Sequence, residues 1–437
     1  MIVMSKYFTK FMFFLVLLAW LGIFLFFRWL ATDEPLSKTS QGFFAQVRQY
    51  NPELKQDPYF YVLGFDAKPD ISPEQFGQTK YHAGWAAFYR DKSITEIEKD
   101  SAQQKKMSAE FLTEKDQALL KKLKENAKNN QVYQDILTHK AALQAIDQQQ
   151  TLLKKRFQMY MALQASDKPL LLSLNHPYPN YGLILSMNYL YISQLAYRHD
   201  LATLQVHIEQ LKQKLSHPEN LVEKMVVLVM LRNCLDLLND LNKADPQHAL
   251  MIPELTSSQL SVQTAFATEF ASPAIYFSRL NREGHESAVF DMLDEQGVEI
   301  EKSKLKQWFY SWVSPFVFQN NMSTNQFALQ VQKAVEWSSL DDQTLLQHMQ
   351  DDNLSIAPRF QVKNYLGQRL VDIANFDLNS YDVRIRMLDQ KIRVLNLLAK
   401  NRKVDLKQLN HHSQAQQFSI KNGRLCMTQL DPLISEE

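Results

Sequence analysis

The chain has 437 residues, with 48 Lys and Arg against 47 Asp and Glu, so its formal net charge at pH 7 is +1. Removing residues 1–30 takes away three basic and no acidic residues, which leaves 45 basic against 47 acidic residues and a net charge of −2. This balance lacks the basic excess of a nucleic-acid-binding domain, so we expect no nucleic-acid partner.

The first predicted element is an uncharged run from Phe11 to Phe27, FMFFLVLLAWLGIFLFF. Seventeen helical residues rise about 26 Å, slightly less than a hydrocarbon core of ~30 Å. The next residues, through Ala31, supply the missing turn. We therefore predict an N-terminal membrane anchor over residues 1–32, whose residues 11–31 contact the lipid bilayer.

Two alternatives to an anchor are weaker. A cleaved signal peptide needs small residues two positions apart at its cleavage site. The candidate pairs are Trp29 with Ala31 and Leu30 with Thr32, and neither fits. A buried helix of a globular core is also disfavoured, because the run is terminal, uncharged and rich in aromatic residues.

The orientation of the anchor follows from a small charge difference. Lys6, Lys10 and the terminal amine precede the span, whereas Asp33 and Glu34 follow it. The positive-inside rule then places the N-terminus in the cytoplasm. We predict a single-pass protein of a bacterial inner membrane with the bulk of the chain in the periplasm. In the reverse orientation that bulk is cytoplasmic and its cysteines are reduced.

Residues 33–100 are predicted to be a linker that passes into an aromatic-rich irregular segment. Its aromatic side chains, among them Tyr59, Tyr61 and Phe65, require burial, which favours an ordered loop over disorder. A short helix follows at 81–94, because its aromatic residues share one helical face.

Residues 101–173 are predicted to form a helical hairpin with a break at 126–130, in the manner of a coiled-coil arm. The segment LNHPYPNYG at 174–182 interrupts the helical pattern and is the predicted domain boundary. Helices are then expected at 183–198, 201–215, 221–241, 257–270, 324–337, 341–349 and 380–400. A 34-residue period is absent, so we expect a non-repetitive bundle rather than tetratricopeptide repeats.

The run WFYSWVSPFVF at 308–318 is apolar but too short to span a bilayer. Burial under neighbouring helices is one interpretation, and a partner-binding patch is the other. Together with the earlier aromatic segment, this run supplies the candidate partner-binding residues, which are Tyr59, Tyr61, Phe65, Trp308, Phe309, Trp312 and Phe316.

The C-terminal region, residues 174–437, is predicted to end in a β-hairpin at 417–429. Apolar residues alternate there around Asn422-Gly423, a pair that favours a two-residue hairpin turn. The chain has two cysteines, Cys234 and Cys426. Outside the cytoplasm they are able to form a disulfide, but Cys234 lies in an apolar helical run, where a buried free thiol is equally expected.

Glycine is scarce, with ten residues in 437, about 2% against a usual ~7%. Tight strand turns and phosphate-binding loops both need glycine, so its scarcity argues against an α/β fold. We predict a mainly α fold, with one N-terminal transmembrane helix, a non-repetitive multi-helix ectodomain and a small C-terminal β-hairpin.

The sequence contains no complete catalytic or metal-binding motif. His285-Glu286 begins a zinc-protease pattern, but Val289 occupies the position of the second histidine. Ser303 and Lys306 match a serine–lysine spacing without the motifs that accompany it. The sequence thus predicts no catalytic, cofactor-binding or metal-binding residue, and it favours a binding protein over an enzyme.

We therefore expect a membrane-anchored helical protein that binds a partner protein at the periplasmic face of the inner membrane. An envelope assembly factor, a membrane-anchored chaperone and an immunity protein against a periplasmic toxin all fit this description. The alternative is a membrane-anchored hydrolase that acts on cell-envelope material, because separated acidic residues leave no local motif. A structural spacer is a third possibility.

Overall fold

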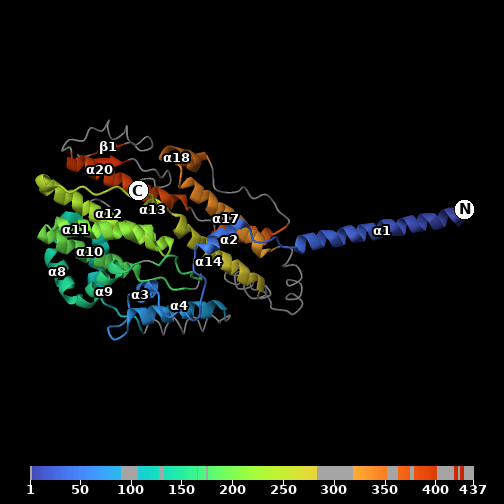
Figure 1. Ribbon diagram of the computed structural model, residues 1–437, viewed down its shortest axis with the longest axis horizontal. Coiled ribbons are helices and arrows are strands. Elements are labelled where there is room, and N and C mark those ends of the chain that lie inside the picture. Colours follow the sequence, from blue (N-terminus) through green and yellow to red (C-terminus); the bar gives the residue numbers. More distant parts are fainter. Residues whose placement is uncertain are drawn as a thin grey trace. The chain divides into compact units, whose positions relative to one another are not determined.

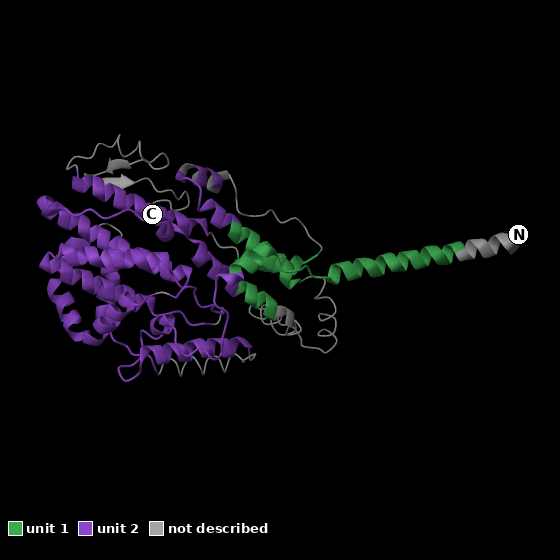
Figure 2. Cartoon of the chain, in the orientation of Figure 1, with its two compact units in different colours: residues 1–43, 273–332, 353–376 green, residues 44–272, 333–352, 377–437 purple. Residues whose placement is uncertain are grey.

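A computed structural model describes residues 2–89, 107–126, 132–164, 166–173, 176–282, 318–351, 363–374 and 378–400, and the backbone of 418–421 and 424–427. Helices make up most of this described chain (Figure 1), which confirms the predicted mainly α fold. The chain divides into two compact units, each assembled from segments that are far apart in the sequence (Figure 2).

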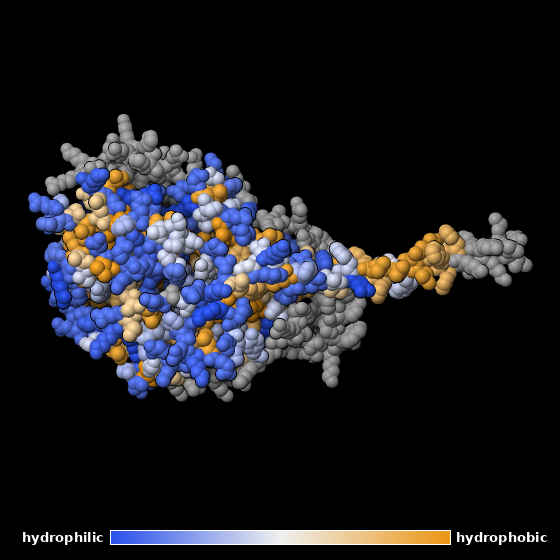
Figure 3. Space-filling view, viewed as in Figure 1, coloured by the Kyte–Doolittle hydropathy of each residue, from blue (hydrophilic) through white to orange (hydrophobic). Residues whose placement is uncertain are grey.

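Unit 1 contains residues 1–43, 273–332 and 353–376. Its long helix is α1 (Ile2–Ala31), and the apolar residues from Phe11 to Phe27 are exposed along it (Figure 3). Phe11–Ala31 has a mean hydropathy of 2.4 and, by length and composition, is the one helix among the described residues that could cross a membrane. The other helices with residues in unit 1 are α2 (Lys38–Ala45), α14 (Gln263–Arg282), α17 (Asn320–Trp337) and α19 (Tyr365–Ala374).

Unit 2 contains residues 44–272, 333–352 and 377–437, and it includes the remaining parts of α2, α14 and α17. Its own elements are α3 (Pro58–Leu63), α4 (Pro73–Tyr89), α6 (Glu114–Asn126), α7 (Val132–Thr138), α8 (Lys140–Gln149), α9 (Thr151–Ala162), α10 (Tyr181–Arg198), α11 (Leu201–Ser216), α12 (Leu221–Ala244), the 3-10 turn η2 (Pro246–His248), α13 (Ser257–Leu260), α18 (Asp342–Asp351), α20 (Asn379–Lys400), β1 (Phe418–Lys421) and β2 (Arg424–Met427).

The core of unit 2 forms around α12, whose long apolar run predicts a central position. Its buried side chains include Val227, Met230 and Leu231, and α10, α11 and α20 pack on it. The N-cap residues of α10, α11 and α12 are Asn180, Asp200 and Asn220. Each of these residues accepts a backbone N–H of the first helical turn on its side-chain oxygen, which satisfies a donor that the helix itself cannot.

The segment predicted to be a linker and an irregular loop contains two helices, α2 and α3, and the short helix predicted at 81–94 is part of α4, which begins earlier, at Pro73, while residues 90–94 lie outside the described residues. Asp57 caps α3 by accepting the backbone N–H of Tyr59 at 2.8 Å, and Pro58 supplies a first residue whose fixed φ suits a helix. Gly77 lets α4 approach α3 closely, because a Cβ there would collide with the backbone of Phe60. The aromatic residues are therefore buried by helix packing rather than by a loop.

Residues 101–173 also differ from the prediction of a two-helix hairpin. Four helices, α6 to α9, occupy the described part, and the predicted second helix is broken at His139 and Gln150. At the second break the side chain of Gln150 donates to the carbonyl of Phe111 at 2.7 Å. Because α7, α8 and α9 each contact α10, the short helices follow the core instead of extending as an arm. The predicted boundary at 174–182 lies inside unit 2.

Three further predictions concern the C-terminal half. Residues 308–317 lie outside the described residues, and Phe318 is buried. At the backbone level β1 and β2 pair antiparallel, with Phe418 opposite Met427, but the side chains are not described, so a hairpin packed on the helical body stays a prediction. Cys234 is a buried free thiol in α12, and burial raises its pKa far above the usual value.

Candidate functional sites

The chain leaves α1 through a junction that hydrogen bonds hold within unit 1. The side-chain amide of Gln319 donates to the carbonyl of Leu30. The carboxylate of Asp33 accepts the backbone N–H groups of Asn321 at 2.8 Å and Met322 at 3.1 Å. These donors belong to the first turn of α17, where a negative charge is favourable. The predicted linker therefore begins as a fixed connection.

Asn325 extends the junction along α17. Its amide nitrogen donates to the Glu34 carboxylate at 2.7 Å and to the Pro35 carbonyl at 3.0 Å. Its amide oxygen accepts from the Ser37 backbone and the Ser40 hydroxyl, both at 2.8 Å. One side chain thus makes four hydrogen bonds to the residues that follow α1, which is the full capacity of an amide.

Asn364 supports the same junction from the segment before α19. It is fully buried, and its backbone φ of 62° lies in the left-handed region, which Asn tolerates better than most residues. Its side-chain oxygen accepts the backbone N–H of Gln319 at 2.7 Å, and its amide nitrogen donates to the Ser323 hydroxyl at 3.1 Å. Gln319 is thereby held where its side chain reaches Leu30.

A second candidate site is a set of buried side chains in unit 2, which we call the carboxylate–tyrosine cluster. Its side chains come from α3, α9, α10 and the start of α12. Asn220 donates to the Tyr59 hydroxyl at 2.9 Å. Glu223 accepts the backbone N–H of Glu219 at 2.9 Å, and Glu219 accepts that of Leu170 at 2.9 Å. Its members are Tyr59, Tyr160, Tyr181, Glu219, Asn220 and Glu223, and each is at most 7% exposed.

Burial dominates the electrostatics of this cluster. It raises the pKa of Glu219 to about 8, with a further contribution from the nearby Glu223 carboxylate. Burial also raises the pKa of Glu223, which the Lys214 ammonium opposes. The neighbouring Glu269, which accepts the backbone N–H of Leu221 at 3.3 Å, has its pKa raised to about 7, again by burial. Removing a carboxylate from water penalises its charged form, so Glu219 keeps a proton that a free glutamate has lost at neutral pH.

The cluster contains buried acidic groups whose hydrogen bonds support the fold. Protonated carboxyls and tyrosine hydroxyls are able to donate as well as accept hydrogen bonds. Each of the three glutamates also accepts a backbone N–H from a turn or a helix start. Glu219 and Glu223 thus connect the first turn of α12 to the chain at Leu170, and Glu269 connects it to α14.

A third candidate is a serine–histidine pair in unit 2. The hydroxyl of Ser173 lies 2.7 Å from His176 Nδ1, and His176 Nε2 donates to the Tyr81 carbonyl at 2.9 Å. This arrangement matches two members of an acyl-transfer triad, with a carbonyl in place of the orienting carboxylate. Burial lowers the pKa of His176 to about 4, which makes the imidazole a weak base. Ser173 and His176 are only 4% and 6% exposed.

The structure places three of the predicted partner-binding residues. Tyr59, Tyr61 and Phe65 are 1%, 6% and 0% exposed and form part of the interior of unit 2. A partner reaches these side chains only if the surrounding helices open, so their role in binding stays a prediction. The other four, Trp308, Phe309, Trp312 and Phe316, lie outside the described residues.

Sequence reasoning missed every residue of the three candidate sites except Tyr59. The glutamates and His176 are single polar residues at helix starts and turns, and only the fold brings them together. The cap at Asn220 was an available signal, because this residue stands directly before a helix. Within the described part of the chain, no group of three His, Cys, Asp or Glu side chains is placed to hold a metal ion.

Comparisons of this chain with protein-family models, with curated proteins and with solved structures found no match.

Proposed function

We propose that this chain is a single-pass protein of a bacterial inner membrane whose helical, periplasmic part binds a partner protein and ends in a small β-hairpin. The observation that carries the proposal is α1, which exposes an apolar surface from Phe11 to Phe27 and continues into the bonded junction of unit 1. Such an exposed apolar helix is stable in lipid and unfavourable in water. The bonded junction suits a protein that holds a folded domain at the membrane.

The binding role takes its support from the described surface of unit 2. On α12, Val222 and Val229 are seven residues apart, so they share one helical face, and they are 39% and 42% exposed. This apolar stripe is the proposed contact surface, in place of the buried aromatic residues. Confining a binder to a membrane raises its effective concentration toward membrane-bound partners. An envelope assembly factor, a chaperone and an immunity protein all remain consistent with this surface.

Topology and binding are tested separately. An alkaline phosphatase fused after Glu437 is expected to be active, because that enzyme folds only in the periplasm. An inactive phosphatase together with a bright fluorescent-protein fusion would contradict the orientation.

For binding, a photo-crosslinking residue replaces Val229, and the control replaces Gln213, an exposed polar residue of α11. We expect an adduct with one envelope protein from position 229 and none from position 213. Recovery of that protein should fall with Val222→Asp and Val229→Asp but not with Gln213→Asp. Equal recovery with all three variants would contradict a contact at the α12 stripe.

The hydrolase alternative has one observation in its favour, the hydrogen bond between Ser173 and His176. A fluorophosphonate probe that reacts with activated serines should then label the wild-type chain and fail to label Ser173→Ala. Ser216→Ala, at an exposed serine pair with Ser258, serves as the matched control. Absence of label from the wild-type chain would remove the support for this alternative.

A further inference from the structure

Basic and aromatic side chains gather in unit 1 where α1 ends. The Lys363 ammonium lies over the Trp29 ring, 5.2 Å from its centroid, and the Arg369 guanidinium lies over the Tyr365 ring at 5.5 Å. Trp29 is 55% exposed and Tyr365 is 45% exposed. We call these four residues, Trp29, Lys363, Tyr365 and Arg369, the collar.

Among the described residues of unit 1, the collar cations have one carboxylate partner. Lys363 and the neighbouring Arg28 have no salt bridge to any described residue, and Arg369 has only a 3.8 Å contact with the exposed Asp372. The nearby acids Asp33 and Glu34 are engaged by Asn321, Met322 and Asn325 in the junction. The collar itself therefore presents two basic side chains and two exposed aromatic rings beside the last turn of α1.

Phospholipid headgroups fit this chemistry. Trp and Tyr favour the boundary between lipid and water, where their rings meet apolar chains and their polar atoms meet water. Lys and Arg pair with phosphate oxygens, and an anionic leaflet attracts basic side chains close to its surface. Trp29 lies at the end of the apolar helix, and Lys363 stacks on it. A membrane-inserted α1 thus brings Lys363 to headgroup level, and Arg369 lies six residues further along the same segment.

We propose that the collar binds the headgroups of anionic phospholipids in the leaflet where α1 leaves the bilayer, so that unit 1 contacts the membrane both through α1 and through the collar. The inference rests on the proposed insertion of α1. It adds a lipid preference, which the insertion of an apolar helix alone does not require.

The test uses native mass spectrometry of the full-length chain in detergent. Short-chain phosphatidylglycerol, short-chain phosphatidylcholine and inorganic phosphate are titrated in separate experiments. We expect phosphatidylglycerol to bind more tightly than the other two. Replacing both collar cations in Lys363→Gln/Arg369→Gln should weaken its binding about thirtyfold, because each basic side chain contributes roughly a factor of five near an anionic surface.

The matched control is Lys333→Gln/Arg384→Gln, which removes the same two charges from the same kinds of ring stack in unit 2, on Trp337 and Tyr381. This control should bind phosphatidylglycerol as the wild type does. The charge-preserving variant Lys363→Arg/Arg369→Lys should also bind it, which guards against a folding defect in the glutamine variant. Equal weakening in both glutamine variants, loss of binding in the charge-preserving variant, or equal binding of all three ligands would overturn the proposal.

Carbonate extraction of cell membranes separates this inference from the function on which it rests. If carbonate releases the wild-type chain, the membrane insertion of α1 fails, and the collar proposal fails with it. If the chain resists carbonate while phosphatidylglycerol shows no preference, only the collar proposal fails.

Discussion

Asn364 and Gly367 show how closely the junction of unit 1 is packed. Asn364 is buried with a positive φ, and its side chain lies against the backbone of Gln319 and the hydroxyl of Ser323. Gly367 lies in the first turn of α19, and a Cβ there would collide with the side chains of Ser323 and Asn364. A side chain at position 367 would therefore displace the group that positions Gln319 under Leu30.

The first prediction is that Gly367→Ala destabilises unit 1 by about 1–3 kcal/mol, the usual cost of overpacking a filled interior. Thermal unfolding of the full-length chain measures the effect. Gly42→Ala in α2 is the control, because a Cβ at that position meets no atom within 4 Å, and alanine favours a helix over glycine. An unchanged melting temperature for Gly367→Ala would contradict the packing described for the junction.

The second prediction concerns the pH dependence of stability. The pKa of Glu219 is raised from 4.5 to about 8, and that of Glu269 to about 7. The folded state therefore holds protons that the unfolded state loses above pH 4.5. The stabilising effect of these protons is complete below that value and is lost as the pH rises through about 7 and 8. Each carboxyl lowers the free energy of unfolding by up to about 1.4 kcal/mol per pH unit in this window.

Denaturant unfolding between pH 5 and pH 9 measures this slope. Glu219→Gln removes the titrating proton and keeps an oxygen that accepts the Leu170 N–H, so its slope should be shallower than that of the wild type. Glu110→Gln changes an exposed residue by the same chemistry and should keep the wild-type slope. A steeper or equal slope for Glu219→Gln would show that Glu219 keeps its usual pKa.

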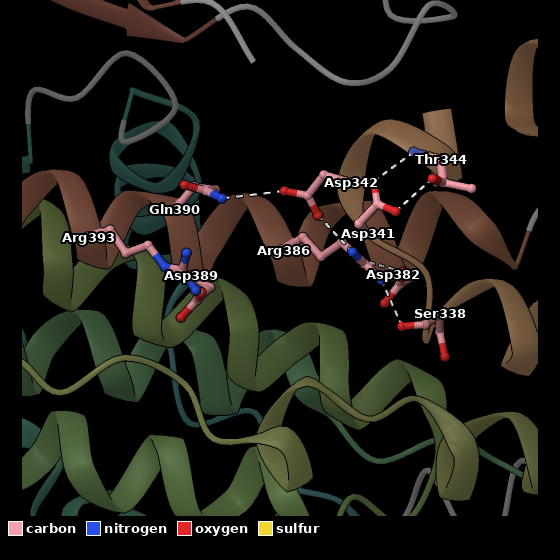
Figure 4. Close-up of polar contacts among 9 residues, drawn as sticks. All are labelled: Ser338, Asp341, Asp342, Thr344, Asp382, Arg386, Asp389, Gln390 and Arg393. Atoms are coloured by element: carbon pink, nitrogen blue, oxygen red, sulfur yellow. Dashed lines mark hydrogen bonds and ion pairs between the residues drawn. The ribbon is translucent and has the colours of Figure 1, made fainter. Parts of the chain in front are cut away.

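At the scale of elements, Arg386 joins α18 to α20 (Figure 4). Its guanidinium contacts the carboxylates of Asp382 at 2.8 Å and Asp342 at 2.7 Å, and it donates to the Ser338 carbonyl at 2.7 Å. Asp341 caps the same end of α18 through the Thr344 backbone and hydroxyl. The planar guanidinium group has several N–H donors and makes these contacts at once, which the single ammonium group of lysine cannot do.

The third prediction is that Arg386→Lys loosens α18 from α20 and costs about 1–3 kcal/mol, the range for lost hydrogen bonds to charged groups. Hydrogen exchange should accelerate in residues 338–351 more than in residues 365–374 of α19. Arg384→Lys, at an exposed position of α20, is the control and should leave both segments unchanged. Uniform acceleration across the chain would indicate a global loss of stability instead of a local one.

The helices differ in how well the sequence pattern alone predicts them. Helices with long apolar periods, such as α10, α11, α12 and α20, were predicted within a few residues because their pattern and their caps agree. The short helices α2, α3 and α19 were missed, since six to ten residues carry too little periodicity. The break of the predicted helix at Gln150 depends on a hydrogen bond to Phe111, a contact that no local pattern contains.

The candidate sites were hidden for a related reason. The cluster residues Tyr59, Glu219 and Glu223 come from segments up to about 160 residues apart, and their pKa values depend on a burial that only the fold creates. The apolar run of α1 needs no fold to be recognised, because its length and its lack of charge are local properties.

At the scale of the whole molecule, the fourth prediction is that deleting residues 2–27 releases the chain from membranes. The shortened chain keeps Leu30 and Asp33, so the junction and the helices outside α1, measured by circular dichroism, should persist. Carbonate should release the shortened chain and leave the full-length chain in the membrane. A control with an unrelated apolar helix of the same length should restore membrane association. If the mature wild-type protein lacks α1 when its N-terminus is sequenced, α1 is a signal peptide and the prediction is wrong.

The hydrogen bonds between residues 30–40 and α17 have a mechanical consequence. A domain suspended on a loose tether tumbles and presents every side in turn. Gln319, Asp33 and Asn325 make hydrogen bonds that fix the chain where it leaves α1. The rest of unit 1 therefore has to rotate and tilt together with α1. If α1 is inserted in a membrane as proposed, lateral diffusion in the plane of the bilayer is the main motion left to unit 1, and a membrane-bound partner would then meet unit 1 in a fixed orientation.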